Sequence, residues 1–301
     1  MEITAILVTF NRLECLKLAL KKFEEQTYLP KRLVIINNKS TDGTFEFLKT
    51  WKKEPSRFEK VVVNSEINRG GAGGFALGLS LAKDYSDTDW IWLSDDDAYL
   101  KENTLKNMYQ IYSSKLKEKN VAALFTSVIN KNEYDLSHRR IVKSGLTGVH
   151  FLPVSAVEYE KDYFQLTQGS YVGMLVRTEM VKLHGGTRED FFIYYDDTEH
   201  SERLNKFGNL YCIPSAEVVH DVDVQFTPSW KDYYAARNST ILINNTYGKY
   251  FAILNVVKRY IKSFDKSKPS SVRQMERTGL IDGLRGKTGL HEVYKPGWKV
   301  D

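Results

Sequence analysis

The stretch Trp90-Ile91-Trp92-Leu93-Ser94-Asp95-Asp96-Asp97 decides the fold class of this chain. A short apolar run that leads directly into three carboxylates is typical of a buried strand whose carboxyl end faces a ligand. Adjacent carboxylates repel one another, and a divalent cation would remove that repulsion. Because side chains alternate along an extended segment, we expect Asp95 and Asp97 to point together and Asp96 to point away. The alternative interpretation is a solvated acidic turn.

Strand-like and helix-like patterns alternate on both sides of this stretch. The strand-like segments are residues 3–9, 32–36, 61–64, 90–93, 122–129 and 169–176. The helical patterns cover residues 11–26, 44–51, 75–83 and 102–119. Asn11 and Glu14 have the spacing of a capping box at the start of the first helix. This alternation predicts an α/β, Rossmann-like fold with a mostly parallel sheet flanked by helices, while residues 130–165 show no clear pattern.

A glycine-rich segment, Asn68-Arg69-Gly70-Gly71-Ala72-Gly73-Gly74, precedes the third predicted helix. Glycines let a backbone approach a ligand closely, and helix N-termini attract anions, so a diphosphate could bind here. A flexible loop explains the same glycines. The polar segment Asn37-Asn38-Lys39-Ser40-Thr41-Asp42-Gly43 follows the second strand. It predicts either a contact with a nucleotide base or an Asx-type turn.

The length of 301 residues favours one main domain with an extension. We expect residues 1–229 to form the α/β domain and residues 230–301 to form a helical, basic extension. From residue 249 to the end there are 12 Lys or Arg and 5 Asp or Glu, so this segment carries +7 and the rest of the chain −2. In residues 250–264, apolar side chains recur at helical spacing with Lys258, Arg259 and Lys262 between them, which indicates a basic amphipathic helix.

The basic helix predicts a partner with an anionic surface. We expect this partner to be a membrane leaflet rather than nucleic acid, which is the alternative. No stretch approaches the roughly 20 apolar residues that cross a bilayer, and the first residues resemble a buried strand rather than a signal peptide. Cys15 and Cys212 are too far apart in sequence to suggest a disulfide framework. We therefore expect a cytoplasmic protein in peripheral contact with the inner face of the cell membrane.

Four segments, in this order, resemble family 2 glycosyltransferases of the GT-A fold. They are Thr9-Phe10-Asn11-Arg12, residues 38–43, residues 68–74 and residues 92–97. Within this family, the glycine-rich segment and the triple aspartate look most like the galactofuranosyltransferase and rhamnosyltransferase branch. The resemblance continues in residues 191–199, in Val218-Val219-His220 and in Tyr234-Ala235-Ala236-Arg237-Asn238. The family usually has Asp where this chain has Asn37.

The resemblance implies a nucleotide-sugar donor and a divalent cation, Mn²⁺ or Mg²⁺. It implies that Asp95, Asp97 and His220 hold the cation, whereas the alternative for this histidine is a structural role. It also implies that Asp197 is the general base and that Asp196 orients the acceptor; the alternative for both is a helix N-terminus, where acidic residues are favoured. The residues expected at the donor are Thr9, Asn11, Arg12, Asn38, Asn68, Gly71, Gly74, Asp96 and Gly169.

Together these features predict an inverting, metal-dependent glycosyltransferase. The expected reaction moves galactofuranose from UDP-galactofuranose onto a bacterial cell-surface glycan such as a lipopolysaccharide, and a lipid-linked acceptor would explain the basic helix. The alternative donor is dTDP-rhamnose. The alternatives of another class are a nucleotidyltransferase that makes a nucleotide-sugar, and a non-catalytic protein that binds a nucleotide-sugar or a glycan.

Overall fold

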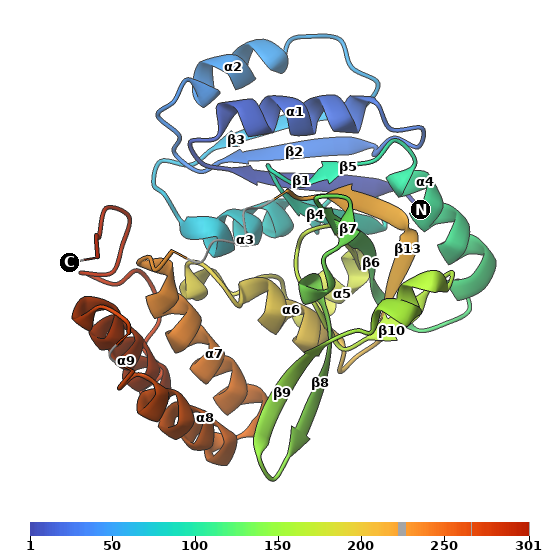
Figure 1. Cartoon of the computed structure of the whole chain (residues 1–301). Helices are drawn as coiled ribbons and strands as arrows, with labels where there is room; N and C mark the ends of the chain where they lie inside the picture. Colours follow the sequence, from blue (N-terminus) through green and yellow to red (C-terminus); the bar gives the residue numbers. More distant parts are fainter. Residues whose placement is uncertain (222–226, 266, 301) are drawn as a thin grey trace.

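The computed structural model describes residues 1–221, 227–265 and 267–300, and a mixed sheet with helices on both faces forms its centre (Figure 1). The strand order is β10-β13-β6-β12-β4-β1-β2-β3, with β5 paired to β13 and β7 paired to β6. The strands of this sheet are β1 (Ile3–Thr9), β2 (Arg32–Asn37), β3 (Glu59–Asn64), β4 (Trp90–Asp95), β5 (Tyr99–Leu100), β6 (Val121–Asn130), β7 (Glu133–Tyr134), β10 (Phe164–Leu166), β12 (Met174–Arg177) and β13 (Asn209–Val219). A second, smaller sheet contains β11 (Gln168–Gly169), β8 (Arg139–Gly145) and β9 (Gly148–Pro153).

The central strands confirm the predicted α/β fold. β1 lies between β2 and β4 and runs parallel to both, and β2 pairs in parallel with β3. β12 runs antiparallel to β4 and β6. The α-helices are α1 (Leu13–Glu24), α2 (Thr44–Trp51), α3 (Gly70–Ala82), α4 (Thr104–Ile111), α5 (Thr178–His184), α6 (Asp196–Leu204), α7 (Lys231–Tyr247), α8 (Lys249–Lys262) and α9 (Ser270–Leu284).

Two hydrophobic layers cover the faces of the sheet, and β1 contributes to both because its side chains alternate. Ile3, Ala5 and Leu7 pack in a layer with residues of α1, α2 and α4. Ile6 and Val8 pack in the opposite layer with residues of α3 and α5. Strands buried on both faces need apolar side chains at most positions, which explains the almost unbroken apolar run of β1.

Three segments differ from the pattern expected of them. The helix predicted over 102–119 is α4 followed by a π-helical turn over Tyr112–Leu116. The strand predicted over 169–176 is divided into β11 and β12, because the chain turns at Gly173, which has a φ of +75° and packs against Thr126. Residues 130–165, which showed no pattern, contain β7, β10 and the β8–β9 hairpin.

The capping box predicted for the first helix is wrong. Asn11 has a left-handed backbone with a φ of 53°, and its Oδ1 accepts a hydrogen bond from the N–H of Thr41 at 2.7 Å. Asp42 caps α1 instead, because its Oδ2 accepts a hydrogen bond from the N–H of Leu13 at 2.9 Å. A cap that comes from the next loop leaves no local spacing for a sequence pattern to detect.

The helices α7, α8 and α9 pack together at the C-terminal end of the chain (Figure 1). Two glycines of α9 allow it to approach α7 closely. A Cβ at Gly279 would lie 2.5 Å from Tyr233 O, and a Cβ at Gly283 would lie 2.6 Å from Arg237 O. α8 also contacts the β8–β9 hairpin, where Lys258 Nζ donates a hydrogen bond to a backbone carbonyl at the hairpin tip. Within the described part of the chain, no helix is both long and apolar enough to span a bilayer.

Candidate active site

A cavity of about 360 Å³ lies at the carboxyl ends of the parallel strands β1, β2 and β4. Ligands of open α/β sheets bind at this edge, because the connecting loops diverge there. Residues from the start of α3, from the segment before α6 and from the start of α7 complete the lining. Among the residues predicted from the sequence, the cavity is lined by Thr9, Arg12, Asn38, Asn68, Gly71, Asp95, Asp96, Asp97, Asp196, Asp197 and His220.

The three consecutive aspartates all line this cavity, with the basic side chains of Arg12 and His220 beside them. Arg12 contacts Asp97 and also reaches Asp96 Oδ1, which lies 3.4 Å from its Nη1. His220 Nε2 lies 3.6 Å from the other oxygen of Asp97. β4 ends at Asp95 and a turn follows, so the strict alternation expected of these side chains does not continue to Asp96 and Asp97.

Burial and the neighbouring charged side chains together give the three carboxyls different pKa values. Burial raises the pKa of Asp95 to about 7, and the neighbouring charges of Asp97 and Asp96 add to the rise. Burial likewise raises the pKa of Asp96 to about 6. Burial also acts on Asp97, but the contacts with His220 and Arg12 outweigh it and lower its pKa to about 2. Asp97 is therefore the carboxylate of the cluster that stays ionised without further charge compensation.

The donor set at Asp95, Asp97 and His220 fits a hard divalent cation in its chemistry. Carboxylate oxygens are the ligands that Mg²⁺ and Mn²⁺ prefer, and imidazole also binds Mn²⁺. The buried Nδ1 of His220 makes no hydrogen bond to any described residue. In the present arrangement, no group of three or more His, Cys, Asp or Glu side chains among the described residues forms a complete metal site, and Arg12 supplies the positive charge beside Asp97.

Two asparagines organise the glycine-rich segment, which begins a helix rather than forming a loop. α3 starts at Gly70, five residues earlier than predicted. Asn38 Nδ2 donates to the carbonyl of Gly70 at 2.9 Å, and Asn38 Oδ1 accepts from the N–H of Arg69 at 2.9 Å. Asn68 Oδ1 accepts from the N–H of Gly70 at 2.8 Å. Gly71 has open space at its Cβ position and lines the cavity, so the helix presents bare backbone to a ligand there.

Three predicted donor residues do not line the cavity. Asn11 points to the loop after β2, as described above. Gly74 is needed for packing, because a Cβ there would lie 2.5 Å from Val8 Cγ1 and would push α3 away from β1. Gly169 packs against Phe125, because a Cβ added at position 169 would lie 2.5 Å from Phe125 Cε1. Gly169 lines a different cavity. Asn37, where the family usually has Asp, is buried and donates from its Nδ2 to Asn64 Oδ1 at 2.8 Å.

The segment before α6 has an unusual backbone. Phe192, Tyr194 and Tyr195 have φ values of 67°, 64° and 67°, a region that costs free energy for residues with a bulky side chain. Asn238 of α7 supports this conformation, because its Nδ2 lies 2.9 Å from the carbonyl oxygens of Phe191, Ile193 and Tyr194. The side chain of Asn238 is fully buried. The C-terminal helices therefore hold the segment that leads into Asp196 and Asp197.

Asp196 and Asp197 occupy the first turn of α6, and both line the cavity. Asp197 Oδ1 accepts a hydrogen bond from the N–H of Thr198 at 2.6 Å. Burial raises the pKa of Asp196 well above its usual value, and the charge of Asp197 raises it further. The pair thus combines a carboxyl that favours its protonated form with a more accessible neighbour.

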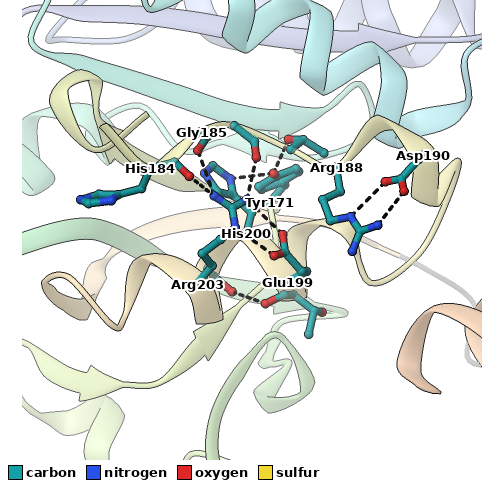
Figure 2. A network of polar contacts seen from close by, with 12 residues as sticks. Tyr171, His184, Gly185, Arg188, Asp190, Glu199, His200 and Arg203 are labelled. Carbon is teal, nitrogen blue, oxygen red and sulfur yellow. Dashed lines mark hydrogen bonds and ion pairs between the residues drawn. The ribbon is translucent and has the colours of Figure 1, made fainter. Parts of the chain in front are cut away.

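A polar network behind α6 holds this helix in place (Figure 2). Arg203 donates from Nε and Nη2 to the carboxylate of Glu199 at 2.9 and 3.0 Å, and it also donates to the backbone carbonyls of residues 184–186. His200 Nδ1 lies 2.8 Å from the hydroxyl of Tyr171, which lines the cavity. Burial lowers the pKa of His200 to about 3, so this histidine is neutral and structural. His200 does not line the cavity that holds the acidic residues.

The cavity includes residues that the sequence did not single out for the donor. Lys231, the first residue of α7, is half-buried and makes no ion pair within the described residues. Burial lowers the pKa of Lys231, because the ammonium group is partly removed from water. Trp230 also lines the cavity, whereas Tyr233 and Tyr234 are buried in a hydrophobic cluster. In the sequence, Lys231 is only a residue near the start of a predicted helix. That position does not indicate that the helix begins beside the carboxyl ends of β1 and β4.

The sequence profile of Glycosyl transferase family 2 matches residues 4–174, which is more than half of the chain. The chain belongs to glycosyl transferase family 2. The matched residues include β1, β2 and β4 and the carboxylate cluster, and they end within β12. The acidic pair at the start of α6 lies beyond them.

Two relatives of this family 2 chain are galactofuranosyltransferases. It is 36% identical over 103 residues to Galactofuranosyltransferase GlfT1 of Mycolicibacterium smegmatis, a match that covers 34% of this chain and 32% of the relative. It is 34% identical over 100 residues to Galactofuranosyltransferase GlfT1 of Mycobacterium tuberculosis, covering 33% and 31%. The match therefore spans about a third of the length of these relatives.

Solved glycosyltransferase structures share the fold of this family 2 chain. GalNAc-T7 with UDP, GalNAc and Mn²⁺ has a TM-score of 0.62 at 14% identity, covering 93% of this chain and 54% of that one. The mannosyltransferase PcManGT of Pyrobaculum calidifontis with GDP-Man and Mn²⁺ has a TM-score of 0.57 at 17% identity, covering 94% and 69%. Staphylococcus aureus TarS with UDP-GlcNAc has a TM-score of 0.55 at 15% identity, covering 81% and 67%. These similarities show a GT-A fold.

Proposed function

We propose that this protein is an inverting, metal-dependent glycosyltransferase that moves a sugar from a nucleotide-sugar donor onto a glycan. The observation that supports the proposal is one cavity lined by two separate acidic groups, residues 95–97 and residues 196–197. Displacement at an anomeric carbon has two requirements, namely compensation of the charge on the leaving diphosphate and a base for the attacking hydroxyl. Residues 196–197 supply the base, and residues 95–97 would supply ligands for a divalent cation that compensates the charge on the diphosphate.

Asp197 acts as the general base in this proposal. It takes the proton of an acceptor hydroxyl while the new glycosidic bond forms and the bond to the nucleoside diphosphate breaks. Attack from the side opposite the leaving group inverts the anomeric configuration. Asp196, whose raised pKa favours the protonated form, donates a hydrogen bond that orients the acceptor.

The donor side of the cavity carries the positive charge that a diphosphate needs. Arg12 and Lys231 both line it. A divalent cation, Mn²⁺ or Mg²⁺, held by Asp95, Asp97 and His220 would neutralise the charge that develops on the departing diphosphate. The remaining donor contacts are assigned to Thr9, Asn38, Asn68, Gly71 and Asp96, which line the same cavity.

The favoured donor is UDP-galactofuranose, because both relatives named above are galactofuranosyltransferases. The acceptor assigned to the enzyme is a bacterial cell-surface glycan on a lipid carrier. A test incubates the protein with UDP-galactofuranose or dTDP-rhamnose, with Mn²⁺, Mg²⁺ or EDTA, and measures release of the nucleoside diphosphate. We expect metal-dependent release of UDP, and NMR of the product should show inverted configuration. Failure to bind UDP with either metal would refute the proposal.

The surface of α8 favours a docking site for an anionic bilayer on the inner face of the cell membrane. Its exposed apolar side chains are Tyr250, Ile253, Val257 and Ile261, which recur every three or four residues and so form one stripe. The exposed Phe264 follows just after the helix. The exposed lysines 249, 258 and 262 flank this stripe. An apolar stripe between basic side chains matches the boundary between acyl chains and anionic headgroups. Docking there would bring the basic C-terminal extension, residues 230–301, to a lipid-linked acceptor.

A further inference from the structure

A second cavity of about 240 Å³ adjoins the active-site cavity. Asp197 and Tyr194 line both cavities, so the proposed base lies where the two meet. The second cavity also contains Gly169, the residue predicted from the sequence to lie at the donor. We infer that this second cavity is the acceptor subsite and that it binds a hydroxyl-bearing sugar ring. This inference rests on the transferase function proposed above.

A buried amide gives the second cavity an unused hydrogen-bond acceptor. Gln168 is only 1% exposed, and its Nε2 donates to Glu202 Oε2 at 3.1 Å. Its Oε1 is also buried and accepts no hydrogen bond from any described residue. Leaving such an oxygen unpaired costs free energy, and a sugar hydroxyl that donates to it would remove that cost.

Arg140 gives the same cavity unused donors. Its Nε donates to the carbonyl of Ser137 at 2.8 Å, and its terminal N–H groups make no hydrogen bond or ion pair within the described residues. His138 adds no charge, because burial lowers its pKa and its Nδ1 is engaged with Ser170 Oγ at 2.8 Å. The cavity therefore offers donors and an acceptor for hydroxyl groups.

The position of the base selects a sugar hydroxyl over an anionic ligand. A carboxylate at Asp197 repels phosphate or carboxylate groups at this end of the cavity. Tyr194 is 43% exposed and borders both cavities, where its ring offers an apolar face to a sugar. An acceptor in the second cavity would approach Asp197 from one side while the donor sugar lies on the other. Inverting displacement requires this arrangement, with the nucleophile opposite the leaving group.

The test uses two substitutions, Gln168→Leu and Arg140→Ala, in the full chain. The acceptor is the octyl glycoside of galactofuranose, rhamnose or galactose that the unmodified protein glycosylates fastest. Because each substitution removes one hydrogen bond to the sugar, we expect KM for the glycoside to rise about tenfold. We expect UDP affinity, measured by calorimetry with Mn²⁺, to stay within about twofold, since the donor cavity is not lined by these residues.

Matched controls separate a local effect from a folding defect. Gln165→Leu changes an exposed glutamine on β10, and Arg285→Ala changes an exposed arginine after α9; both should leave KM for the glycoside unchanged. An unchanged KM in Gln168→Leu and Arg140→Ala, or UDP binding by the unmodified protein without transfer to any of the glycosides, would overturn the acceptor subsite. Loss of UDP binding in the unmodified protein would instead refute the proposed function itself.

Discussion

Asp197 carries the most direct prediction at the scale of single residues. We expect Asp197→Asn to lower the rate of sugar transfer by about 10²–10⁴-fold, because the amide cannot accept the proton of the acceptor hydroxyl. UDP affinity should change little, since a base acts mainly in the transition state. Initial rates and calorimetry measure the two quantities. The control is Asp84→Asn, an exposed carboxylate distant in sequence from both acidic groups. Full transfer activity in Asp197→Asn would remove this residue from the role.

Asn238 is expected to affect Asp197 indirectly, because it holds the backbone of residues 191–194, which leads into α6. Asn238→Ala would remove the two N–H donors of Nδ2, which are shared among three backbone carbonyl oxygens. We expect the free energy of unfolding to fall by about 2 kcal/mol, at about 1 kcal/mol for each of the two N–H donors. Transfer should fall in kcat more than UDP affinity does, since the segment that positions Asp197 loses its support. Denaturant unfolding and steady-state kinetics test this.

Asn245→Ala is the matched control for Asn238, because Asn245 is an exposed asparagine of the same helix. Its stability and kcat should equal those of the unmodified protein. If Asn238→Ala lost stability but retained full kcat at a temperature where it is folded, the residue would have a structural role only.

At the scale of elements, α8 is the part of the chain expected to touch the membrane. Replacing Ile253, Val257 and Ile261 together with Ser removes most of the apolar stripe without touching the core, since all three are exposed. Exposed apolar side chains gain free energy on entering a bilayer. We therefore expect binding to phosphatidylglycerol vesicles to weaken by at least about tenfold. Sedimentation with vesicles measures the bound fraction.

A salt titration and a control substitution on another helix complete the experiment on α8. Binding of the unmodified protein should weaken as salt is added, because screening reduces the attraction between lysines and anionic headgroups. Leu183→Ser, at a side chain that is 66% exposed on α5, should leave vesicle binding unchanged. Equal binding by the triple variant and the unmodified protein would show that α8 has no role at the membrane.

At the scale of the whole molecule, His200 links stability to pH. The folded protein keeps this side chain neutral because burial lowers its pKa to about 3, whereas the unfolded chain takes up a proton near pH 6.5. The unfolded state therefore binds more protons below pH 6.5, and stability is lost as the pH falls towards 3. Between pH 7 and pH 5, His200 should account for a loss of about 2 kcal/mol.

Two substitutions isolate the contribution of His200. His200→Gln can still form a hydrogen bond with Tyr171 but does not titrate, so its stability should fall by about 2 kcal/mol less over this pH range. His150→Gln, at an exposed histidine, should follow the unmodified protein. Denaturant unfolding at several pH values gives these differences. Identical pH profiles for His200→Gln and the unmodified protein would contradict the prediction.

The parts of the fold that were predictable are those that local patterns encode. β1 and β4 were recognisable because strands buried on both faces are built from nearly continuous apolar runs. The carboxylates at 95–97 and 196–197 were recognisable because their order along the chain resembles one family. By contrast, the residue type at Gly74 suggested a ligand contact, although the structure uses this glycine to bring α3 against Val8.

The amino-acid sequence by itself determined the order of strands and helices up to residue 129, the family, and the position of the two acidic groups along the chain, because each depends on neighbours along the chain. Only the tertiary structure decided that Lys231 lines the same cavity as both acidic groups, that Asn238 supports the segment before Asp197, and that Gln168 lines a second cavity. These contacts join residues far apart in sequence. Close packing and the need to pair buried polar groups select such contacts, and neither leaves a periodic pattern in the chain.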